Sequence, residues 1–390
     1  LPVVNLVVLE IGLALGLALL AMNPAWWWAA VLGVLIAVPL GLGRWQGLWM
    51  VRWIQLWARY RLRSRRRGIT TPGPAAGHDD PRLALLQLAL PDLAVVPGTD
   101  RGREPLGLAW CQGAWTAVLE VDAAPSMITP VDADAAPGLP LSALVPCLAD
   151  RGVVLDAIQV ISHCYPGCAV PPSSSPAARS YLDILGQSPA PARRTTWVAV
   201  RLDPRRCPAA VAERGGGVAG CHRALIGALA RVRSALESRG VPTRPLDTDQ
   251  LLRAGTIAAG LALPLPGELH RKTDSRQPVT LAEGWAALAA GGVGHASYAI
   301  TGWDGAPDLS ALAGVRALST TLVLSLSPGA AGEGVGLRGV LRLSARTPAQ
   351  LEAAEDQLRA ATHRHRLALR PLWGQQLSGL AATLPLGAPG

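Results

Sequence analysis

A run of glycines from Gly215 to Gly220 is the part of this 390-residue chain that most resembles a cofactor site. The run reads Gly-Gly-Gly-Val-Ala-Gly, which matches the G-x-G-x-x-G fingerprint, and it lies between a predicted strand and a predicted helix. In dinucleotide-binding proteins, such glycines let a pyrophosphate approach the N-terminus of the helix. The candidate phosphate loop therefore consists of Gly215, Gly216, Gly217 and Gly220.

Three features of the surrounding sequence disagree with a dinucleotide site. About eleven residues separate the predicted strand from the glycines, whereas the fingerprint requires a tight turn. The strand and the helix belong to a split pattern and not to a plain parallel β-α-β unit. No acidic residue stands at a strand end about 20 residues further on, because Glu237 still lies within the predicted helix. We therefore favour an ordinary flexible loop before a helix.

Soft metal ligands occur after another predicted strand, where His163, Cys164 and Cys168 form an H-C-x-x-x-C pattern. Zinc sites usually need a second pair of soft ligands at short spacing. Further candidates lie far away in the sequence and could approach only through folding, namely Cys207, Cys221 and His222. Small buried thiols beside a loop are the simpler interpretation, so we predict no metal site.

Other enzyme signatures are absent from the sequence. It contains no GKS/T phosphate loop, no G-x-S-x-G elbow and no H-E-x-x-H motif. We therefore predict that the protein is not an enzyme and needs no cofactor. The alternative function is a membrane-tethered nucleotide-binding enzyme or sensor that uses the Gly215–Gly217 loop.

The elements that must position these residues repeat along the chain. In residues 83–247, the patterns predict a pair of strands (106–122), a helix (141–152), two strands (154–162 and 195–203), a long helix (218–240) and a final strand (241–247). Residues 295–390 repeat this order, at residues 297–303, 309–317, 319–327, 336–346, 347–365 and 367–373. We predict an α+β region with two ferredoxin-like (β-α-β-β-α-β) units in tandem, each an antiparallel sheet with two helices on one face.

Two connecting segments complete the soluble region. A helical connector, 248–294, lies between the two units, and its helices are expected near 248–262 and 280–290. A linker rich in glycine and proline, 68–82, precedes the first unit.

The first 43 residues are almost entirely apolar. Residues 3–22 could span a hydrocarbon core at 1.5 Å per residue, and residues 25–42 form a second span after the turn Asn23-Pro24. A signal peptide is the competing interpretation, but no basic segment precedes the first span and a second one follows at once. We predict a two-helix transmembrane hairpin over residues 1–43, with both ends cytoplasmic.

Glu10 is a carboxylate inside the first span, where a charge is costly and usually has a partner. It either contacts a helix of a neighbouring subunit or a nearby arginine such as Arg44. Alternatively, it reaches water near the end of a shortened span, because the chain starts with Leu1 and we expect some native residues to be missing before it. The sequence leaves these readings open.

Residues 44–67 predict an amphipathic helix that leaves the membrane. Tryptophans recur every four residues and would share one face of that helix, namely Trp45, Trp49, Trp53 and Trp57. Arginines close the segment, namely Arg59, Arg61, Arg63, Arg65, Arg66 and Arg67. An aromatic belt followed by arginines is typical of a cytoplasmic exit and of contact with anionic lipid. The apolar face either lies flat in the membrane interface or docks a neighbouring subunit.

The positive charge of the chain is concentrated in this flank. The net charge is +9, and residues 1–68 hold eight arginines and one acid, Glu10, which leaves only +2 for the other 322 residues. A nucleic-acid surface would require basic residues clustered on the folded region, so nucleic-acid binding is not expected. The six cysteines all follow the arginines, so we place them in a reducing cytoplasm without disulfides.

This layout resembles the EccE family, a membrane component of the type VII (ESX) secretion systems of mycobacteria and related actinobacteria. The stretches that carry the resemblance are WARYRLRSRRR, GAWTAVLEVD, LDAIQVISH, TTWVAVRLDP and RGGGVAGCHRALIGALARV. The resemblance implies a multi-pass inner-membrane protein with a cytoplasmic C-terminal domain. It also implies a structural or assembly role in a core complex with EccB, EccC and EccD, in which EccC is the ATPase that energises export. EccE brings no catalytic motif that could be transferred to this chain.

Overall fold

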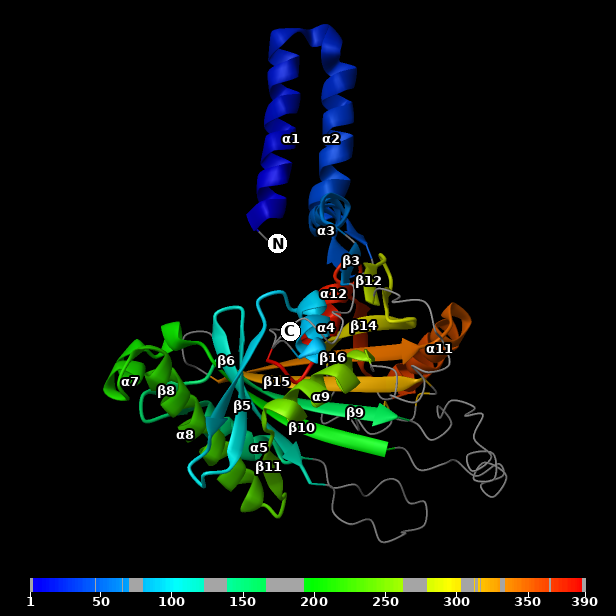
Figure 1. Cartoon of the computed structure of the whole chain (residues 1–390). Helices are drawn as coiled ribbons and strands as arrows, with labels where there is room; N and C mark the ends of the chain where they lie inside the picture. The colour runs from blue at the N-terminus through cyan, green and yellow to red at the C-terminus, as the bar shows by residue number, and fades with distance from the viewer. Residues whose placement is uncertain are drawn as a thin grey trace. The chain divides into compact units, whose positions relative to one another are not determined.

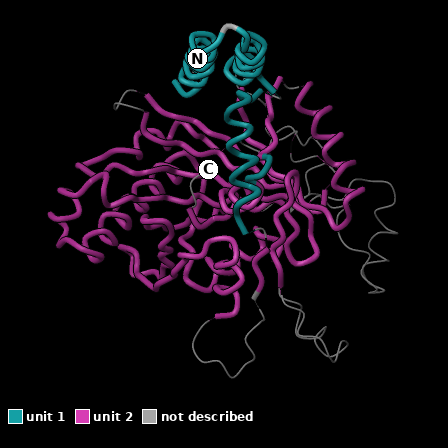
Figure 2. Tube along the Cα trace, turned by 90° about the horizontal axis from the view of Figure 1, so that it is seen from above, with its two compact units in different colours: residues 1–65, 373–375 teal, residues 66–372, 376–390 magenta. Residues whose placement is uncertain are grey.

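The computed structural model describes residues 3–45, 47–64, 66–69, 80–122, 139–165, 193–261, 279–302, 317–329, 334–364 and 366–387, together with Leu312 and Val315. The chain forms two compact units, which are coloured separately in Figure 2. Unit 1 is Leu1–Arg65 with Trp373–Gln375, and unit 2 is Arg66–Leu372 with Gln376–Gly390. Each unit is described by itself.

Unit 1 is built on a pair of apolar helices. Helix α1 (Val3–Met22) and helix α2 (Trp27–Leu42) run side by side and are joined by the short 3-10 helix η1 (Pro24–Trp26), as Figure 1 shows. Glycines let the two backbones approach, because a Cβ on Gly12 would collide with the Cβ of Ala37. The hairpin of helices that the apolar segments predict is therefore present.

Among the described residues, helix α1 is long enough and apolar enough to cross a membrane. Helix α2 is also apolar but shorter, with 16 residues. A polar contact ties the ends of the pair together, since the buried amide of Asn5 donates a hydrogen bond of 2.8 Å to the carbonyl oxygen of Gly41.

The predicted continuous helix over residues 44–67 is wrong. Strands β1 (Arg44–Trp45) and β2 (Leu48–Trp49) form a short hairpin, and helix α3 (Met50–Leu62) begins only after it. The cause is local backbone geometry, because Gly47 has a φ of 80°, at which a right-handed helix does not continue. The four-residue spacing of the tryptophans is compatible with a helix but does not require one.

Unit 2 contains one antiparallel sheet of 13 strands within the described residues. Its order is β3-β12-β13-β14-β16-β15-β9-β10-β6-β5-β4, with β11 on β6 and β17 on β14. The strands are β3 (Arg66–Ile69), β4 (Ala94–Thr99), β5 (Pro105–Cys111), β6 (Ala114–Val121), β9 (Ala157–Tyr165), β10 (Arg193–Leu202), β11 (Thr243–Pro245), β12 (Val279–Glu283), β13 (Leu288–Ala290), β14 (Val293–Gly302), β15 (Ser319–Pro328), β16 (Val335–Ala345) and β17 (Ala368–Pro371).

The two halves of this sheet follow the same strand order. The first half runs β11-β6-β10-β9 and the second runs β17-β14-β16-β15. Helix α8 (Gly217–Glu237) leads from β10 to β11, and helix α11 (Pro348–Arg364) leads from β16 to β17. Helix α5 (Leu141–Leu144) and the 3-10 helix η3 (Val145–Leu148) lie between β6 and β9. The helix predicted at 309–317 lies mostly outside the described residues, so complete tandem ferredoxin-like units stay a prediction.

The two predicted units share one sheet and are not separate. Strand β9 pairs with β15 from Cys164 opposite Thr320 to Ile158 opposite Leu326. An open strand edge leaves backbone donors and acceptors unpaired, and this pairing satisfies them for both halves. Such a pairing joins residues far apart in the sequence, which local patterns do not report.

Helices cover both faces of the sheet, whereas the prediction placed them on one face. Helices α5, α8 and α11 pack on one face in a large apolar cluster that includes Leu225, Val198 and Leu341. Helices α4 (Pro81–Ala89), α9 (Thr248–Ala259) and α12 (Gln376–Ala382) pack on the other face in a second cluster with Trp197 and Val323. Helix α9 lies in the predicted connector, whereas α4 lies at the start of the first predicted unit and α12 lies near the end of the second, where the sequence patterns predicted no helix.

The helix expected near 280–290 is also wrong. This segment is the hairpin of β12 and β13, in which Leu281 lies opposite Ala290. Short apolar runs do not distinguish strands from helices, so the spacing of apolar residues in this segment wrongly predicted a helix. The helix expected near 248–262 is confirmed as α9.

Two further boundaries differ from the prediction. The helix expected at 141–152 ends at Leu148, because β7 (Ala149–Asp150) turns through Arg151 and Gly152, both with positive φ, into β8 (Val153–Val154). The predicted linker 68–82 begins within β3 and ends within α4, and its residues 70–79 lie outside the described part of the chain.

Candidate membrane and partner interface

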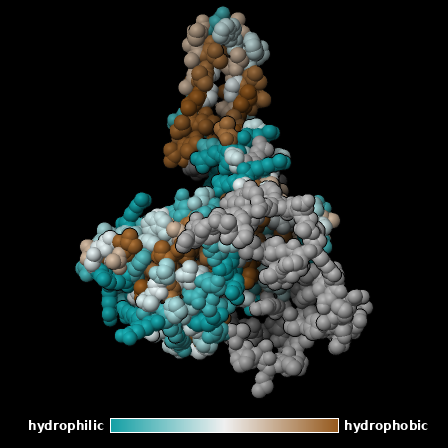
Figure 3. Space-filling model, in the orientation of Figure 1, coloured by the Kyte–Doolittle hydropathy of each residue, from teal (hydrophilic) through white to brown (hydrophobic). Residues whose placement is uncertain are grey.

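The helix pair of unit 1 exposes large apolar side chains along its length. Leu17 and Leu35 are each 66% exposed, and Figure 3 shows the surface of the pair as predominantly hydrophobic. Water would solvate this surface poorly, since each exposed apolar side chain forgoes roughly 1.5–3 kcal/mol of burial. The surface therefore suits lipid chains or other apolar helices.

One side of the helix pair is hollowed into an apolar groove of about 630 Å³. Residues of both helices line it, including Leu13, Gly16 and Leu17 of α1 and Val31, Leu35 and Val38 of α2. The helices approach closely beside Gly16, where a Cβ would lie 3.5 Å from the carbonyl oxygen of Ala30. The groove is thus an open channel along the pair and not a hole through it.

Glu10 lies on the exposed side of α1. It makes no hydrogen bond or ion pair with another described residue. The predicted contact with Arg44 is not formed, because the Arg44 guanidinium carbon lies 4.1 Å from the centroid of the Trp49 ring. A cation over an aromatic face is favourable in itself, so Arg44 already has a partner.

The tryptophans do not form the single stripe that a helix would give them. Trp45 and Trp49 belong to β1 and β2, whereas Trp53 and Trp57 lie one turn apart on α3. The guanidinium carbon of Arg61 lies 5.1 Å from the centroid of the Trp57 ring. The structure therefore brings together Trp53 and Trp57 as an aromatic pair on one face, and separates the other two.

The predicted arginine cluster is divided between the two units. Arg59 and Arg61 are exposed in the last turn of α3, where positive charge suits the negative end of the helix dipole. Arg63 donates a hydrogen bond of 3.0 Å to the carbonyl oxygen of Gly374. Arg65 lies outside the described residues.

The remaining two arginines belong to the sheet of unit 2. Arg66 and Arg67 lie on β3, opposite Ala282 and Leu281 of β12. Arg67 also donates a hydrogen bond of 3.1 Å to the carbonyl oxygen of Leu88. This hydrogen bond holds the guanidinium of Arg67 against α4.

The glycine loop has a structural explanation. Gly215, Gly216 and Gly217 all have positive φ, at 101°, 65° and 53°. The amides of Gly215 and Gly216 already donate hydrogen bonds of 3.0 Å to the carbonyl oxygens of Ala212 and Val211. Donors that are used within the loop are not available to a phosphate.

The helix around this loop also departs from a dinucleotide fold. The 3-10 helix η5 (Pro204–Arg206) and helix α7 (Pro208–Glu213) intervene between β10 and the loop. Gly220 lies where α8 packs on α7, and a Cβ there would collide with the carbonyl oxygen of Val211. Packing and turn geometry therefore account for the glycines of this motif.

Thiols in the described part of the chain are buried and unpaired, namely Cys111, Cys147, Cys164, Cys207 and Cys221. Burial raises the pKa of the Cys147 and Cys164 thiols, which disfavours the reactive thiolate. No group of three or more potential ligands is arranged around a metal position within the described residues, and Cys168 lies outside them.

Sequence reasoning missed a buried polar cluster on the α9 side of the sheet. The Arg342 side chain is fully buried, and its Nη2 donates hydrogen bonds to the carbonyl oxygen of Ala258 and, at 3.1 Å, to Oγ1 of Thr321. His163 Nδ1 lies 2.8 Å from the same Thr321 hydroxyl. A hydroxyl can accept one hydrogen bond and donate another, so Thr321 links Arg342 and His163.

A second histidine belongs to the same cluster. Nδ1 of His295 lies 2.9 Å from Oγ of Ser344, its neighbour across the β14–β16 pair. Burial and the charge of Arg342 lower the pKa of His295, and they lower that of His163 to about 3. Burial also lowers the pKa of Arg342 to about 9, so the guanidinium stays charged at neutral pH. Polar residues at alternate positions of otherwise apolar strands were the signal that sequence reasoning could have used.

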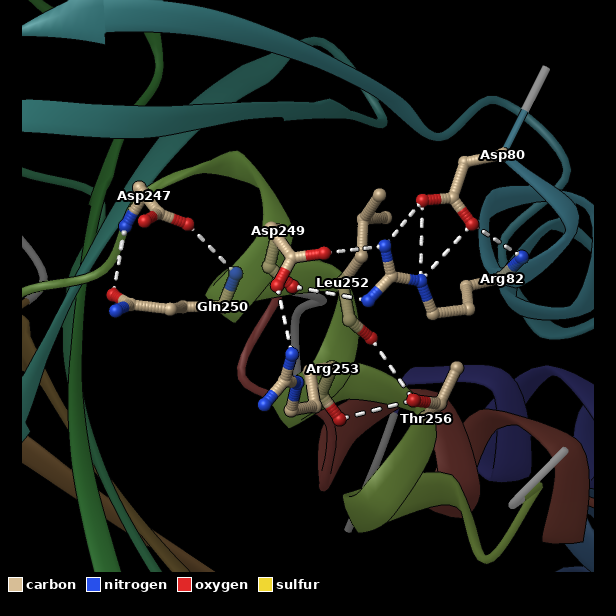
Figure 4. A network of polar contacts seen from close by, with 8 residues as sticks. All are labelled: Asp80, Arg82, Asp247, Asp249, Gln250, Leu252, Arg253 and Thr256. Atoms are coloured by element: carbon tan, nitrogen blue, oxygen red, sulfur yellow. Dashed lines mark hydrogen bonds and ion pairs between the residues drawn. The ribbon is translucent and has the colours of Figure 1, made fainter. Parts of the chain in front are cut away.

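A network of polar contacts links α9 to α4, as Figure 4 shows. The carboxylate of Asp80 accepts a hydrogen bond of 2.8 Å from the amide of Arg82 and caps α4. The Arg82 guanidinium also donates at 2.6 Å to Asp249 of α9. At the start of α9, Asp247 and Gln250 form a reciprocal capping box.

Comparison with known proteins connects this architecture to one family. The EccE family, described as a proposed type VII ESX secretion system translocon, matches residues 190–300. The matched region includes β10, the glycine loop, α8, α9 and most of β14.

Curated proteins with similar sequences carry the same family name. The ESX-1 secretion system protein EccE1 of Mycobacterium tuberculosis is 41% identical over 61 residues, which are 16% of this chain and 13% of that protein. The protein of that name from Mycolicibacterium smegmatis is 38% identical over 64 residues, 16% of this chain and 14% of its own length. The family match and these similarities agree, and they relate part of this chain to the EccE proteins of the type VII (ESX) secretion system.

Proposed function

We propose that this protein is a non-enzymatic structural subunit that assembles an inner-membrane type VII secretion core complex. The observation that carries the proposal is the exposed apolar helix pair of unit 1, in a chain whose unit 2 includes the EccE-family region. An apolar surface of this kind requires lipid or protein to cover it.

The proposed membrane arrangement follows from the distribution of charge. Both α1 and α2 insert, and η1 lies outside the membrane without any basic residue. Arg59 and Arg61 follow the second span, which favours a cytoplasmic C-terminal side by the positive-inside rule. Trp53 and Trp57 then lie at headgroup depth beside anionic lipid.

Unit 2 serves as the cytoplasmic scaffold in this proposal. Its sheet is continuous through the pairing of β9 with β15 and has helices on both faces, which supports its use as one platform. EccB, EccC and EccD are the proposed partner subunits, and EccC supplies the energy for export as an ATPase. This protein contributes surfaces for assembly and no chemistry.

Purification from the native host tests the proposal. The tagged full chain, extracted in mild detergent, should elute in a large complex that contains the other core subunits. Deletion of the gene should reduce the amount of that complex. If the complex forms normally without this chain, and the chain elutes alone, the structural role is wrong.

A further inference from the structure

Helix α1 carries a row of exposed side chains with the spacing of a helix-packing face. Leu6, Glu10, Leu13, Leu17 and Leu20 are separated by four, three, four and three residues. This repeat of 3.5 residues on average is the pattern by which one helix packs along another. Leu13 and Leu17 are 52% and 66% exposed, so no described element covers this face, which we call the Glu10 face.

The Glu10 face forms one wall of the apolar groove, and α2 supplies the other. Leu13, Leu17 and Leu20 line the groove from α1. Exposed residues of α2 line it at spacings of four, four and three, namely Trp27, Val31, Leu35 and Val38. The small residues Gly16 and Ala30 lie between these two rows and leave space there. The two rows can therefore bind a third helix that packs along both α1 and α2.

Glu10 shows what chemistry that third helix needs. Its side chain is exposed on this face and makes no ion pair or hydrogen bond with a described residue. In a membrane, a carboxylate without a partner is expensive and calls for a donor from a neighbouring helix. Arg44 does not serve, because its guanidinium lies over Trp49.

A second copy of this chain does not supply the missing charge. Residues 3–42 contain no arginine, lysine or histidine, so another copy would place a second Glu10 in the membrane and not a cation. The amide of Asn5 is already used, since it donates to Gly41. The complementary helix therefore belongs to a different protein.

We propose that the groove between α1 and α2 binds one transmembrane helix of another subunit, and that a basic side chain of this helix pairs with Glu10. The proposal rests on the proposed membrane function and deepens it by naming the chemistry of the partner. Leu13, Leu17, Val31 and Leu35 bury the apolar surface of that helix, and Glu10 sets its depth and register.

Photo-crosslinking in native-host membranes tests this seat. A photoreactive amino acid replaces Leu17 in the groove or, as a matched control, Ile11, which is 54% exposed on α1 but does not line the groove. We expect the Leu17 probe to give a crosslink that mass spectrometry maps to a membrane-spanning segment with an arginine or lysine. The Ile11 probe should not give this product.

Variants of Glu10 then test the charge pairing. Glu10→Leu and Glu10→Gln should reduce the Leu17 crosslink by roughly three- to thirty-fold, whereas Glu10→Asp should retain most of it. Reversing both charges, with Glu10→Arg here and an acidic residue in place of the partner's basic one, should restore the product. An unchanged yield in Glu10→Leu, or a product that contains a second copy of this chain or only lipid, overturns the proposal.

Membrane fractionation and co-purification of the core complex, measured on the same samples, separate the two proposals. If the chain stays in the membrane and in the complex while the crosslink ignores Glu10, the helix seat is wrong and the assembly role stands. If the chain leaves the membrane fraction even without substitution, both proposals fail.

Discussion

Arg342 is a charged side chain held entirely inside the protein. Within the described residues it has no ion-pair partner, and its guanidinium donates to the carbonyl of Ala258 at the end of α9. The C-terminal end of a helix carries partial negative charge, which offsets part of the cost of burying the cation. Arg342 and desolvation together keep His163 and His295 neutral, because a second positive charge in this cluster would be unfavourable.

This cluster predicts that unit 2 loses stability in acid. The pKa of His163 is about 3 in the folded chain and near 6.5 when unfolded, so the unfolded state binds more protons between these values. Stability should therefore be constant above about pH 6.5 and fall below it, by about 1.4 kcal/mol per pH unit for each histidine. Urea unfolding of the detergent-solubilised chain, followed by tryptophan fluorescence at several pH values, measures this slope.

His163→Gln should reduce the change of the free energy of unfolding per pH unit by the amount that one histidine contributes, about 1.4 kcal/mol. The matched control is His363→Gln, because His363 is exposed at the end of α11. Equal slopes in the unsubstituted chain and His163→Gln would contradict the assignment of the buried histidine.

Gly216 provides a prediction that separates backbone geometry from nucleotide binding. It adopts φ 65° and ψ 176°, a region that only glycine occupies readily. Gly216→Ala should lower the free energy of unfolding by about 1–3 kcal/mol. Gly294→Ala is the control, since its Cβ would make only ordinary contacts, at 3.6 Å and beyond. Nucleotides should not shift the melting temperature of the unsubstituted chain; a shift that Gly216→Ala abolishes would instead support the nucleotide loop.

Helix α9 contacts the buried cluster through the carbonyl oxygen of Ala258, which accepts a hydrogen bond from Arg342. Its start is fixed by the capping box of Asp247 and Gln250, and its end by Gly260 in the left-handed conformation. Between them, the bond from Arg82 to Asp249 links α9 to α4. These contacts place the Ala258 carbonyl where Arg342 can reach it.

The two aspartates at the start of α9 should contribute unequally to stability. Asp247→Ala removes the cap and should cost about 0.5–2 kcal/mol. Asp249→Ala removes the ion pairs with Arg82 and Arg253, in which the Asp249 carboxylate is half-exposed, and should cost about 0–1 kcal/mol. Urea unfolding of both variants at pH 7.5 measures the difference. A larger loss for Asp249→Ala would show that the link to α4 holds the helix more than its cap does.

The pairing of β9 with β15 joins the two halves of the sheet in unit 2. Because the halves share one sheet, the backbone hydrogen bonds of one half continue into the other. Val323 lies at this junction, opposite Ile161 on one side and Val340 on the other. We therefore expect the halves to unfold together.

Val323→Pro tests this cooperativity. Proline lacks the amide donor and disrupts a central strand, so amide hydrogen exchange should accelerate in both halves of the sheet. Val323→Ala is the control, because it removes side-chain volume but keeps the amide, and it should open the sheet far less. If exchange accelerates only in residues 279–387, the halves behave as independent domains.

The sequence by itself determined the features that depend on neighbouring residues. The bounds of α1, the concentration of charge beside the apolar spans and most strands of unit 2 follow from local apolar patterns and residue counts. The same local evidence correctly identified α9. It also directed attention to Glu10, because a carboxylate within an apolar span is visible without any fold.

Only the tertiary structure decided the features that join distant residues. A single positive φ at Gly47 interrupts the helix that the tryptophan spacing predicted. The pairing of β9 with β15 merges two predicted units, and three further helices cover the second face of the sheet. Arg342, Thr321 and His163 meet only because their strands are neighbours in the sheet. Local periodicity reports which side of an element is apolar, whereas packing between distant elements decides what that side contacts.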